Sequence, residues 1–223
     1  MSTDPKVVIA TSIPPAMKRD NDGQPFGPEY QDLCVQSWME CGFRVLSIND
    51  REEIELLAER YPQVEFIATD RNASALTGRK NPYIADLLRA LAEADAATVG
   101  IINSDILFQP SPAWNELLPL LKRGVSLVCA RQDTNSLLFG ALRSFFFGLD
   151  CFFFKREVAA ELAADAKPYA MGVPWWDYWF PLALIARGHD VLLIDRPAIV
   201  HLEHPTAYSD GSARRMTLQF ADR

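Results

Sequence analysis

Strand-like and helix-like segments alternate through the first 130 residues of the chain, and only short connectors separate them. Apolar runs rich in β-branched residues, typical of buried strands, occupy 6–12, 43–48, 64–68, 97–103 and 125–130. Segments with apolar residues at helical spacing lie between them, at 29–41, 50–60, 83–94 and 111–122. Because this order favours parallel strands covered by helices, we predict an α/β fold with a Rossmann-like, mixed but mostly parallel sheet and helices on both faces.

The second half of the chain is less regular than the first. Strand-like patterns occupy 146–155, 191–194 and 198–201, and helical patterns occupy 156–165 and 175–187. The stretch at 203–223 has little periodicity, and we expect it to fold over a site. Neither an internal repeat nor a long linker divides the chain, so we predict a single domain over 1–223.

Composition narrows the possible functions. With 223 residues, 49% of them hydrophobic, the chain is long enough for one domain with a substantial core. A formal net charge of -7 argues against a general nucleic-acid surface, so we expect no nucleic acid partner. No secretory leader and no transmembrane segment is visible, which indicates a cytoplasmic protein. The four cysteines lack a C-x-x-C pair and are interpreted as reduced core thiols.

The most informative motif is the triplet Asn103-Ser104-Asp105, which follows a strand-like run. In an open α/β sheet, ligands bind at the carboxyl ends of the strands. An isolated triplet of this kind also suits a turn whose side chains cap local backbone groups. The apolar residues on both sides favour a ligand, because a carboxylate that emerges from a buried strand needs a partner such as a divalent cation.

A second motif places Asp177 within an aromatic run at 174–181. Aromatic faces beside a carboxylate are suited to holding a sugar, and an acid in apolar surroundings gains the raised pKa that a general base needs. The run is equally compatible with a helix start, where Asp177 would favour the helix dipole and the rings would belong to the core.

Two of the three histidines, His201 and His204, lie near the end of the last strand-like segment. Alternation along the strand puts His201 on the same side as Glu203, with His204 at the strand's end. Each histidine could instead be structural. Dispersed ligands of mixed type, such as these histidines with Asp105, suit Mn²⁺ or Mg²⁺ better than structural zinc.

A polar loop at 70–81 carries three cations, among them Arg71 and Lys80. These cations could face a diphosphate, although a solvated loop is the simpler alternative for any one of them. The chain has neither G-x-x-x-x-G-K-[ST] nor G-x-G-x-x-G, so the sequence supports neither a P-loop ATPase nor a dinucleotide oxidoreductase.

Taken in their order along the chain, these motifs resemble the nucleotide-diphospho-sugar transferase superfamily, the glycosyltransferases of the A-type fold. The motifs that carry the resemblance are short and separated, and they span nearly the whole chain: 10–15, Asp86 in the helix before a strand, Asn103-Ser104-Asp105, 148–154, Trp175-Trp176-Asp177 and His201-Leu202-Glu203-His204. The resemblance implies a nucleotide-binding half over 1–108 and an acceptor half over 109–223. It implies a nucleotide-diphosphate sugar as donor and a carbohydrate or other hydroxyl as acceptor.

On the donor side, the resemblance assigns roles to single residues. Asn103-Ser104-Asp105 corresponds to the D-x-D element that binds the divalent cation and the sugar nucleotide. Asn103 stands where an acid is expected, and Asp105 stands at the position that contacts the cation. Thr11 and Ser12 fall at the nucleotide-binding end of the first strand.

On the acceptor side, Asp177 corresponds to the acid that acts as base or contacts the acceptor, and Asp150 is the second choice for that base. His201 or His204 corresponds to the late histidine that completes the metal shell. We therefore expect a metal-dependent glycosyltransferase, in which a cation and basic side chains stabilise the charge that develops on the leaving diphosphate.

Two other classes of protein are compatible with the same residues. A sugar nucleotidyltransferase would share the first half of the fold, but it should carry a glycine-rich phosphate loop after the first strand, where this chain has Ile13-Pro14-Pro15. A non-catalytic module that binds a sugar or a nucleotide would explain the aromatic run and the altered triplet without turnover.

Overall fold

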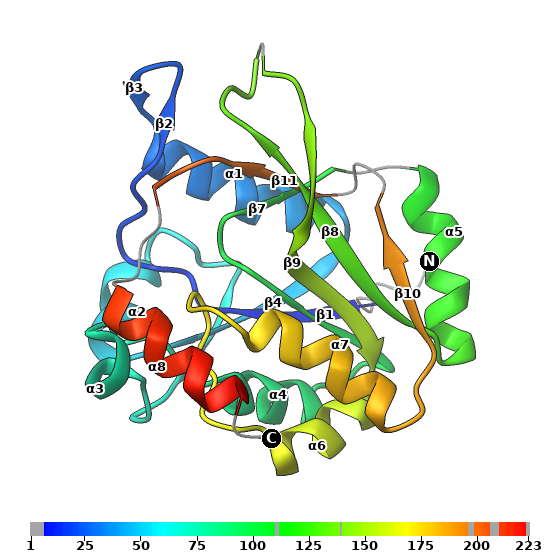
Figure 1. Ribbon diagram of the computed structural model, residues 1–223. Helices are drawn as coiled ribbons and strands as arrows, with labels where there is room; N and C mark the ends of the chain where they lie inside the picture. Colours follow the sequence, from blue (N-terminus) through cyan, green and yellow to red (C-terminus); the bar gives the residue numbers. More distant parts are fainter. Residues whose placement is uncertain (1–6, 110–111, 139, 196–198, 206–209, 222–223) are drawn as a thin grey trace.

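The computed structural model describes residues 7–109, 112–138, 140–195, 199–205 and 210–221 (Figure 1). Its centre is a nine-stranded sheet in the order β5-β4-β1-β6-β9-β8-β11-β7, with β10 beside β8. The strands of this sheet are β1 (Val7–Thr11), β4 (Phe43–Asn49), β5 (Glu65–Ala68), β6 (Thr98–Ile102), β7 (Ile106–Phe108), β8 (Ser126–Thr134), β9 (Arg143–Lys155), β10 (Val191–Ile194) and β11 (Ile199–Leu202). A separate two-stranded hairpin consists of β2 (Asp20–Asn21) and β3 (Gln24–Pro25).

Parallel pairing dominates the sheet. β1 pairs in parallel with β4 and β6, β4 with β5, and β8 with both β10 and β11. β9 runs against β6 and β8, and β7 runs against β11. The prediction of a mixed, mostly parallel sheet in a single α/β domain is therefore confirmed.

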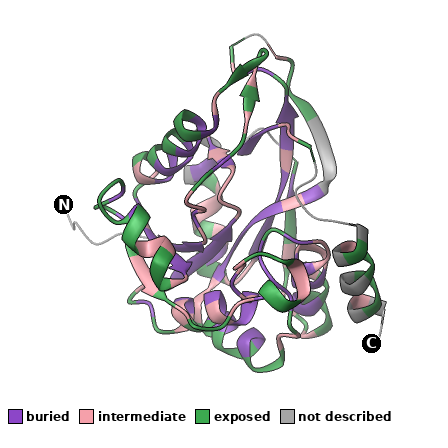
Figure 2. Ribbon diagram, turned by 90° about the vertical axis from the view of Figure 1, so that its left-hand side faces the viewer, coloured by how far each residue is buried: buried purple, intermediate pink, exposed green. Residues whose placement is uncertain are grey.

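Helices cover both faces of the sheet (Figure 1). They are α1 (Gly27–Glu40), α2 (Arg51–Leu57), α3 (Ser74–Thr77), α4 (Ile84–Ala92), α5 (Pro112–Arg123), α6 (Arg156–Asp165), α7 (Trp176–Ala186) and α8 (Asp210–Ala221). One hydrophobic cluster includes residues of α1, α2 and α5, and the other includes residues of α4, α6 and α7. Figure 2 shows the buried strands between the exposed outer sides of the helices. None of the helices among the described residues is long and apolar enough to cross a membrane.

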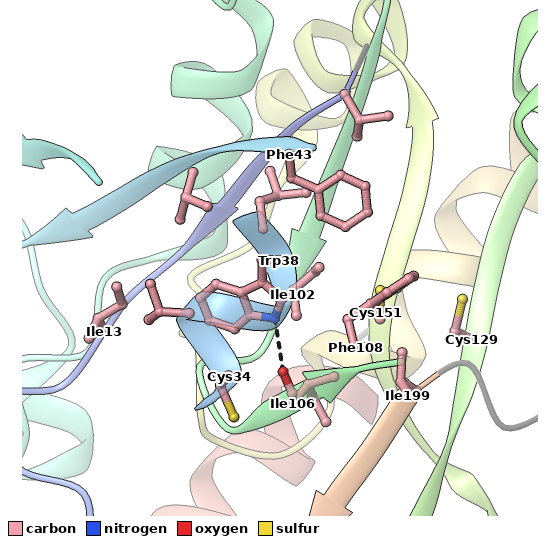
Figure 3. Packing of buried hydrophobic residues seen from close by; sticks show 14 of the residues in the cluster. Ile13, Cys34, Trp38, Phe43, Ile102, Ile106, Phe108, Cys129, Cys151 and Ile199 are labelled. Carbon is pink, nitrogen blue, oxygen red and sulfur yellow. Dashed lines mark hydrogen bonds between the residues drawn. The ribbon is translucent and has the colours of Figure 1, made fainter. Parts of the chain in front are cut away.

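Buried side chains fix the helices and strands to one another. Trp38 of α1 is fully buried, and its Nε1 donates a hydrogen bond to the carbonyl of Ile106 in β7 at 2.9 Å (Figure 3). Gly100 of β6 lies where a Cβ would come within 2.6 Å of the carbonyl oxygen of Phe152. Only a glycine lets β6 approach β9 this closely at that point.

The structure also contains elements that the sequence patterns did not predict. β7 follows the Asn-Ser-Asp triplet directly, and the loop after β1 folds back as the β2–β3 hairpin. β9 begins at Arg143, before the predicted 146–155. The described part of the aperiodic tail forms α8, where Phe220 stacks on Trp175 with ring centroids 5.0 Å apart.

Tyr30 of α1 ties together the two segments that later form the site. Its side chain is fully buried, and its hydroxyl accepts a hydrogen bond from the backbone N–H of Leu202 at 2.9 Å. The same hydroxyl lies 3.0 Å from the carbonyl oxygen of Asp105 and 3.3 Å from that of Val200. The turn after β6 is thus held beside the end of β11.

We predict that Tyr30→Phe lowers the free energy of unfolding by about 1–3 kcal/mol, because it leaves the buried N–H of Leu202 without a partner. Chemical denaturation followed by circular dichroism measures the loss. The control is Tyr83→Phe, whose hydroxyl forms no hydrogen bond with the described residues; its effect should stay within about 0.5 kcal/mol. Equal losses in the two variants would contradict the assignment of Tyr30 as the tie.

Candidate functional site

A cleft of about 610 Å³ opens at the carboxyl ends of β1 and β6. Its lining residues come from the loops after these strands, from α2, from the 70–81 loop and from segments of the second half: Ser12, Pro14, Ala16, Met17, Lys18, Arg19, Glu53, Arg79, Lys80, Asn81, Asn103, Ser104, Asp105, Met171, Gly172, His204 and Pro205. This is the edge of an open α/β sheet where ligands bind. The start of the aperiodic tail, His204 and Pro205, contributes to the wall, whereas none of the α8 side chains that the structure describes does.

Asp105, His201 and His204 form a cluster at this edge, called here the Asp105 trio. One potential ligand atom from each residue lies within 4.8 Å of the others. Asp105 Oδ2 is 3.5 Å from His201 Nε2 and 3.4 Å from His204 Nε2. Strand register explains the meeting, because β11 pairs with β7 so that His201 lies opposite Ile106, the residue after Asp105.

The donor set of the trio fits a divalent metal ion. His201 Nε2 is buried and forms no hydrogen bond with the described residues, so it has an unused lone pair or proton that points toward Asp105. One carboxylate and two imidazoles are ligands that Mn²⁺ and other transition metals accept, whereas Mg²⁺ prefers oxygen. Asp133 would act on the metal through His201, since its Oδ1 lies 3.0 Å from His201 Nδ1 and fixes the imidazole ring.

The electrostatics of the trio depend on opposite charges in contact. Burial raises the pKa of Asp105, but His201, His204 and Arg19 outweigh it and hold the pKa well below the usual range. Burial lowers the pKa of His201, but the carboxylates of Asp105 and Asp133 raise it to about 9. The two carboxylates therefore favour the imidazolium form of His201, whose positive charge balances theirs.

A chain of polar contacts links the trio to the opposite end of the Asn-Ser-Asp triplet. Arg131 donates from Nε to Asp133 Oδ1 and from Nη1 to Asp150 Oδ2, each at 2.8 Å. Asp150 accepts a short hydrogen bond from the Asn103 side-chain amide, and the Asn103 backbone N–H donates to the Asp150 carbonyl at 2.9 Å. Asn103 thus donates a hydrogen bond to a carboxylate of the protein itself, that of Asp150. An aspartate at position 103 would repel this carboxylate.

The cleft contains cations that were not among the predicted site residues. Arg19 Nη2 lies 2.5 Å from Asp105 Oδ2, and Lys18 also lines the wall. The sequence could have indicated them, because two neighbouring basic residues follow the first strand by a few positions.

Lys80, which the sequence did predict, lines the cleft, and its ammonium group pairs with the carboxylates of Asp50 at 3.0 Å and Glu52 at 2.7 Å. Asp133 and Arg131 gave no signal, since only the pairing of distant strands brings them to the trio.

The structure brings only some of the other predicted nucleotide-side residues to the cleft. Ser12 lines it, whereas Thr11 is fully buried and its hydroxyl has no hydrogen-bond partner among the described residues. Arg71 does not line the cleft. Its Nη1 lies 3.3 Å from Asp86 Oδ1, and its guanidinium lies over the ring of Tyr83. Of the 70–81 loop, it is the segment around Lys80 that faces the cleft.

The two predicted acids of the acceptor side lie outside the cleft lining. Asp177 is in the first turn of α7, and its Oδ1 is buried with no hydrogen-bond partner among the described residues. Burial, with a smaller contribution from the Asp150 charge, raises the pKa of Asp177 to about 7. Trp175, the residue before α7, has the unusual φ of 85°. Asp150 is buried and held by Arg131 and Asn103.

No protein-family model matches the chain, and no curated protein matches it. Solved structures match its fold. The inositol-1-phosphate CTP transferase from T. maritima has a TM-score of 0.55 at 12% identity, over 95% of this chain and 95% of that chain. The CMP:2-keto-3-deoxy-manno-octonic acid synthetase complexed with CTP has a TM-score of 0.51 at 12% identity, over 97% and 98%.

The bifunctional IspDF from Campylobacter jejuni also matches, with a TM-score of 0.51 at 11% identity over 86% of this chain. The present chain spans 50% of that protein's length. Identities this low show the fold alone. The chain thus shares a Rossmann-like fold with proteins that are nucleotidyltransferase-like by their names, whereas the specific resemblance to A-type glycosyltransferases is not confirmed by these matches.

Proposed function

We propose that this protein is a divalent-metal-dependent transferase that binds the polyphosphate of a nucleotide in the cleft and makes or uses a nucleotide-linked sugar. The observation that carries the proposal is the position of the Asp105 trio at a cleft lined by four cations: Lys18, Arg19, Arg79 and Lys80. A metal site beside clustered basic side chains suits a substrate with several phosphate charges.

The chain's own residues divide the work by their positions. Lys18, Arg79 and Lys80 bind phosphate oxygens, and Arg in particular forms paired hydrogen bonds with them. Ser12, at the end of β1, contacts the nucleoside. The trio holds the cation, which when bound supplies positive charge where charge develops on the leaving phosphate. Residues 1–108 provide most of this nucleotide side, and residues 109–223 provide the second substrate's side.

Nucleotidyl transfer from a nucleoside triphosphate to a sugar phosphate is the reaction favoured here over glycosyl transfer. The matched proteins include, by their names, a CTP transferase and a synthetase complexed with CTP. The attacking phosphate oxygen of such a reaction is already ionised, so no general base is required. This agrees with a cleft whose lining contains neither Asp177 nor Asp150.

Glycosyl transfer from a nucleotide-diphosphate sugar is the second candidate, and one observation favours it. The 12–19 loop after β1 contains no glycine and includes Pro14 and Pro15, so it cannot supply the close backbone approach of a glycine-rich phosphate loop. In this reaction Asp177 would accept the proton of the acceptor hydroxyl, for which its raised pKa is suited. Asp150 would keep its ion pair with Arg131 and orient the acceptor side.

Product analysis separates the two reactions. The protein is incubated with Mn²⁺ or Mg²⁺ and either a nucleoside triphosphate plus sugar 1-phosphates or a panel of nucleotide-diphosphate sugars plus acceptors. We expect pyrophosphate and a nucleotide sugar from the first mixture, reduced by about 100-fold or more in Asp105→Asn. Free nucleoside diphosphate and a glycosylated acceptor from the second mixture would support the glycosyltransferase instead. Turnover in neither mixture would contradict both.

Metal binding tests the trio directly. We predict that the protein binds Mn²⁺, followed by the electron paramagnetic resonance of free Mn²⁺, and that Asp105→Asn and His204→Gln each weaken binding by about tenfold or more. Glu203→Gln is the control, since Glu203 lies between the two histidines in sequence but pairs with Arg143. A loss in Glu203→Gln as large as in the other two would contradict the trio.

The same titration should depend on pH. His201 must lose its proton to bind the cation, and its pKa of about 9 keeps it protonated at pH 7. Mn²⁺ affinity should therefore rise by about tenfold per pH unit between pH 6 and 8. An affinity that does not change over this range would contradict a protonated His201 as a ligand of the cation.

Asp177 gives a prediction about stability. Its pKa is about 7 in the folded protein and near the ordinary value when unfolded, so the folded state binds the proton more tightly and stability falls as pH rises from about 4 to 7. Asp177→Asn should remove this fall, gaining on the order of 2–4 kcal/mol relative to wild type between pH 4 and pH 8. Denaturation at several pH values measures it, with exposed Asp95→Asn as control. Parallel pH profiles for wild type and Asp177→Asn would contradict the raised pKa.

A further inference from the structure

Arg19 is the cation in closest contact with the trio, and its side chain is only 9% exposed. Its Nη2 lies 2.5 Å from Asp105 Oδ2, the same oxygen that faces both histidines. Nη1 donates to the Lys18 carbonyl at 2.7 Å, whereas Nε is buried and has no hydrogen-bond partner among the described residues. The guanidinium is therefore bound at one end and has an unused donor at the other.

The backbone around Arg19 is fixed. The Phe26 N–H donates to the Arg19 carbonyl at 2.9 Å and closes the β2–β3 hairpin onto the start of α1. The hairpin is attached to the β8–β9 connection, since Ser136 Oγ donates to Asp22 Oδ2 at 2.7 Å and the Leu137 N–H donates to Asn21 Oδ1 at 3.0 Å. With the backbone held, a change of partner by Arg19 requires only its side chain to move.

A metal ion in the trio would compete with Arg19 for Asp105. The carboxylate oxygen nearest the histidines is the one that Arg19 occupies, and a dication beside a guanidinium at such short range is strongly repelled. Arg19 is therefore a resident counter-ion that balances Asp105 before metal binds, and metal binding alone must break that ion pair.

A polyphosphate in the cleft would give the displaced guanidinium a new partner. Arg19, Lys18 and Arg79 share the cleft wall, and a guanidinium binds phosphate oxygens through two parallel donors. Nε, which is buried here and has no partner among the described residues, would become available for such a pair once the side chain turns away from Asp105. Transfer of Arg19 from carboxylate to phosphate thus removes the obstacle to the metal at the moment when the nucleotide arrives.

We propose that Arg19 couples the two ligands of the cleft: it weakens the binding of a divalent cation alone, and it makes cation and polyphosphate bind cooperatively. This inference rests on the proposed function, because it takes the trio as the metal site. By thermodynamic linkage, the factor by which a nucleotide strengthens metal binding equals the factor by which the metal strengthens nucleotide binding. Arg19 thereby favours occupation of the cleft by both ligands over occupation by the metal alone.

The test measures Mn²⁺ affinity by electron paramagnetic resonance, without and with saturating CDP, for wild type and three variants of the full chain. Arg19→Met removes the counter-ion, Arg19→Lys keeps a positive charge, and Arg79→Met is the matched control that removes a cation from the same cleft. A titration of Mn²⁺ with CDP in the absence of protein corrects for their complex in solution. Circular dichroism and thermal unfolding verify that each variant is folded.

We expect Arg19→Met to bind Mn²⁺ alone about tenfold more tightly than wild type, and the strengthening by CDP to shrink by a similar factor. Arg19→Lys should stay closer to wild type, and Arg79→Met should bind Mn²⁺ alone within about twofold of wild type. Arg19→Met binding Mn²⁺ alone no more tightly than wild type would overturn the inference. An equal gain in Mn²⁺ affinity in Arg79→Met would also overturn the inference, because the loss of any positive charge from the cleft would then explain the effect.

Asp105→Asn distinguishes failure of this inference from failure of the proposed function. If Asp105→Asn weakens Mn²⁺ binding while Arg19→Met behaves as wild type, the trio stands as the metal site and the coupling role of Arg19 is wrong. If Asp105→Asn binds Mn²⁺ as wild type does, the trio is not the metal site, and the proposed function and the inference both fail.

Discussion

The negative charge of Asp105 is the constraint on which the site depends. A carboxylate just after the buried strand β6 requires partners, and Asp105 contacts Arg19 from the loop after β1 and two histidines, His201 and His204, from the end of β11 and the residues after it. The loop after β1, the turn after β6 and the end of β11 are consequently drawn to one edge of the sheet. The cleft lies between the elements that this charge holds together.

The second half of the chain completes a site that the first half begins. Asp105 lies at the edge formed by the parallel strands β4, β1 and β6, but the histidines that accompany it come from β11 and the residues after it. β8 and β9 contribute the support behind them, since Asp133 orients His201 while Arg131 joins Asp133 to Asp150. The site is therefore built across the point where the sheet changes from parallel to mixed pairing.

Local patterns predicted the elements and the acid at the strand end. The spacing of apolar residues and the turn-forming residues were sufficient to predict the parallel strands and most helices. The apolar residues around Asp105 indicated a carboxylate that needs a partner. What stayed hidden depends on contacts between residues far apart in sequence. The pairing of His201 with Asp133 follows from the register of β11 on β8, and β7 is too short to show a period of its own. Arg71 and Lys80 share one loop, and only the fold separates their partners.

The central claim is that Asp105, His201 and His204 hold a divalent cation beside a polyphosphate. Crystals grown with Mn²⁺ and CDP, measured at the manganese absorption edge, test it most directly. We expect one strong anomalous peak within coordination distance of Asp105 and both histidines, with the CDP phosphates against the cations of the cleft and the Arg19 guanidinium turned toward them. A peak elsewhere, or none while CDP occupies the cleft, would contradict the account.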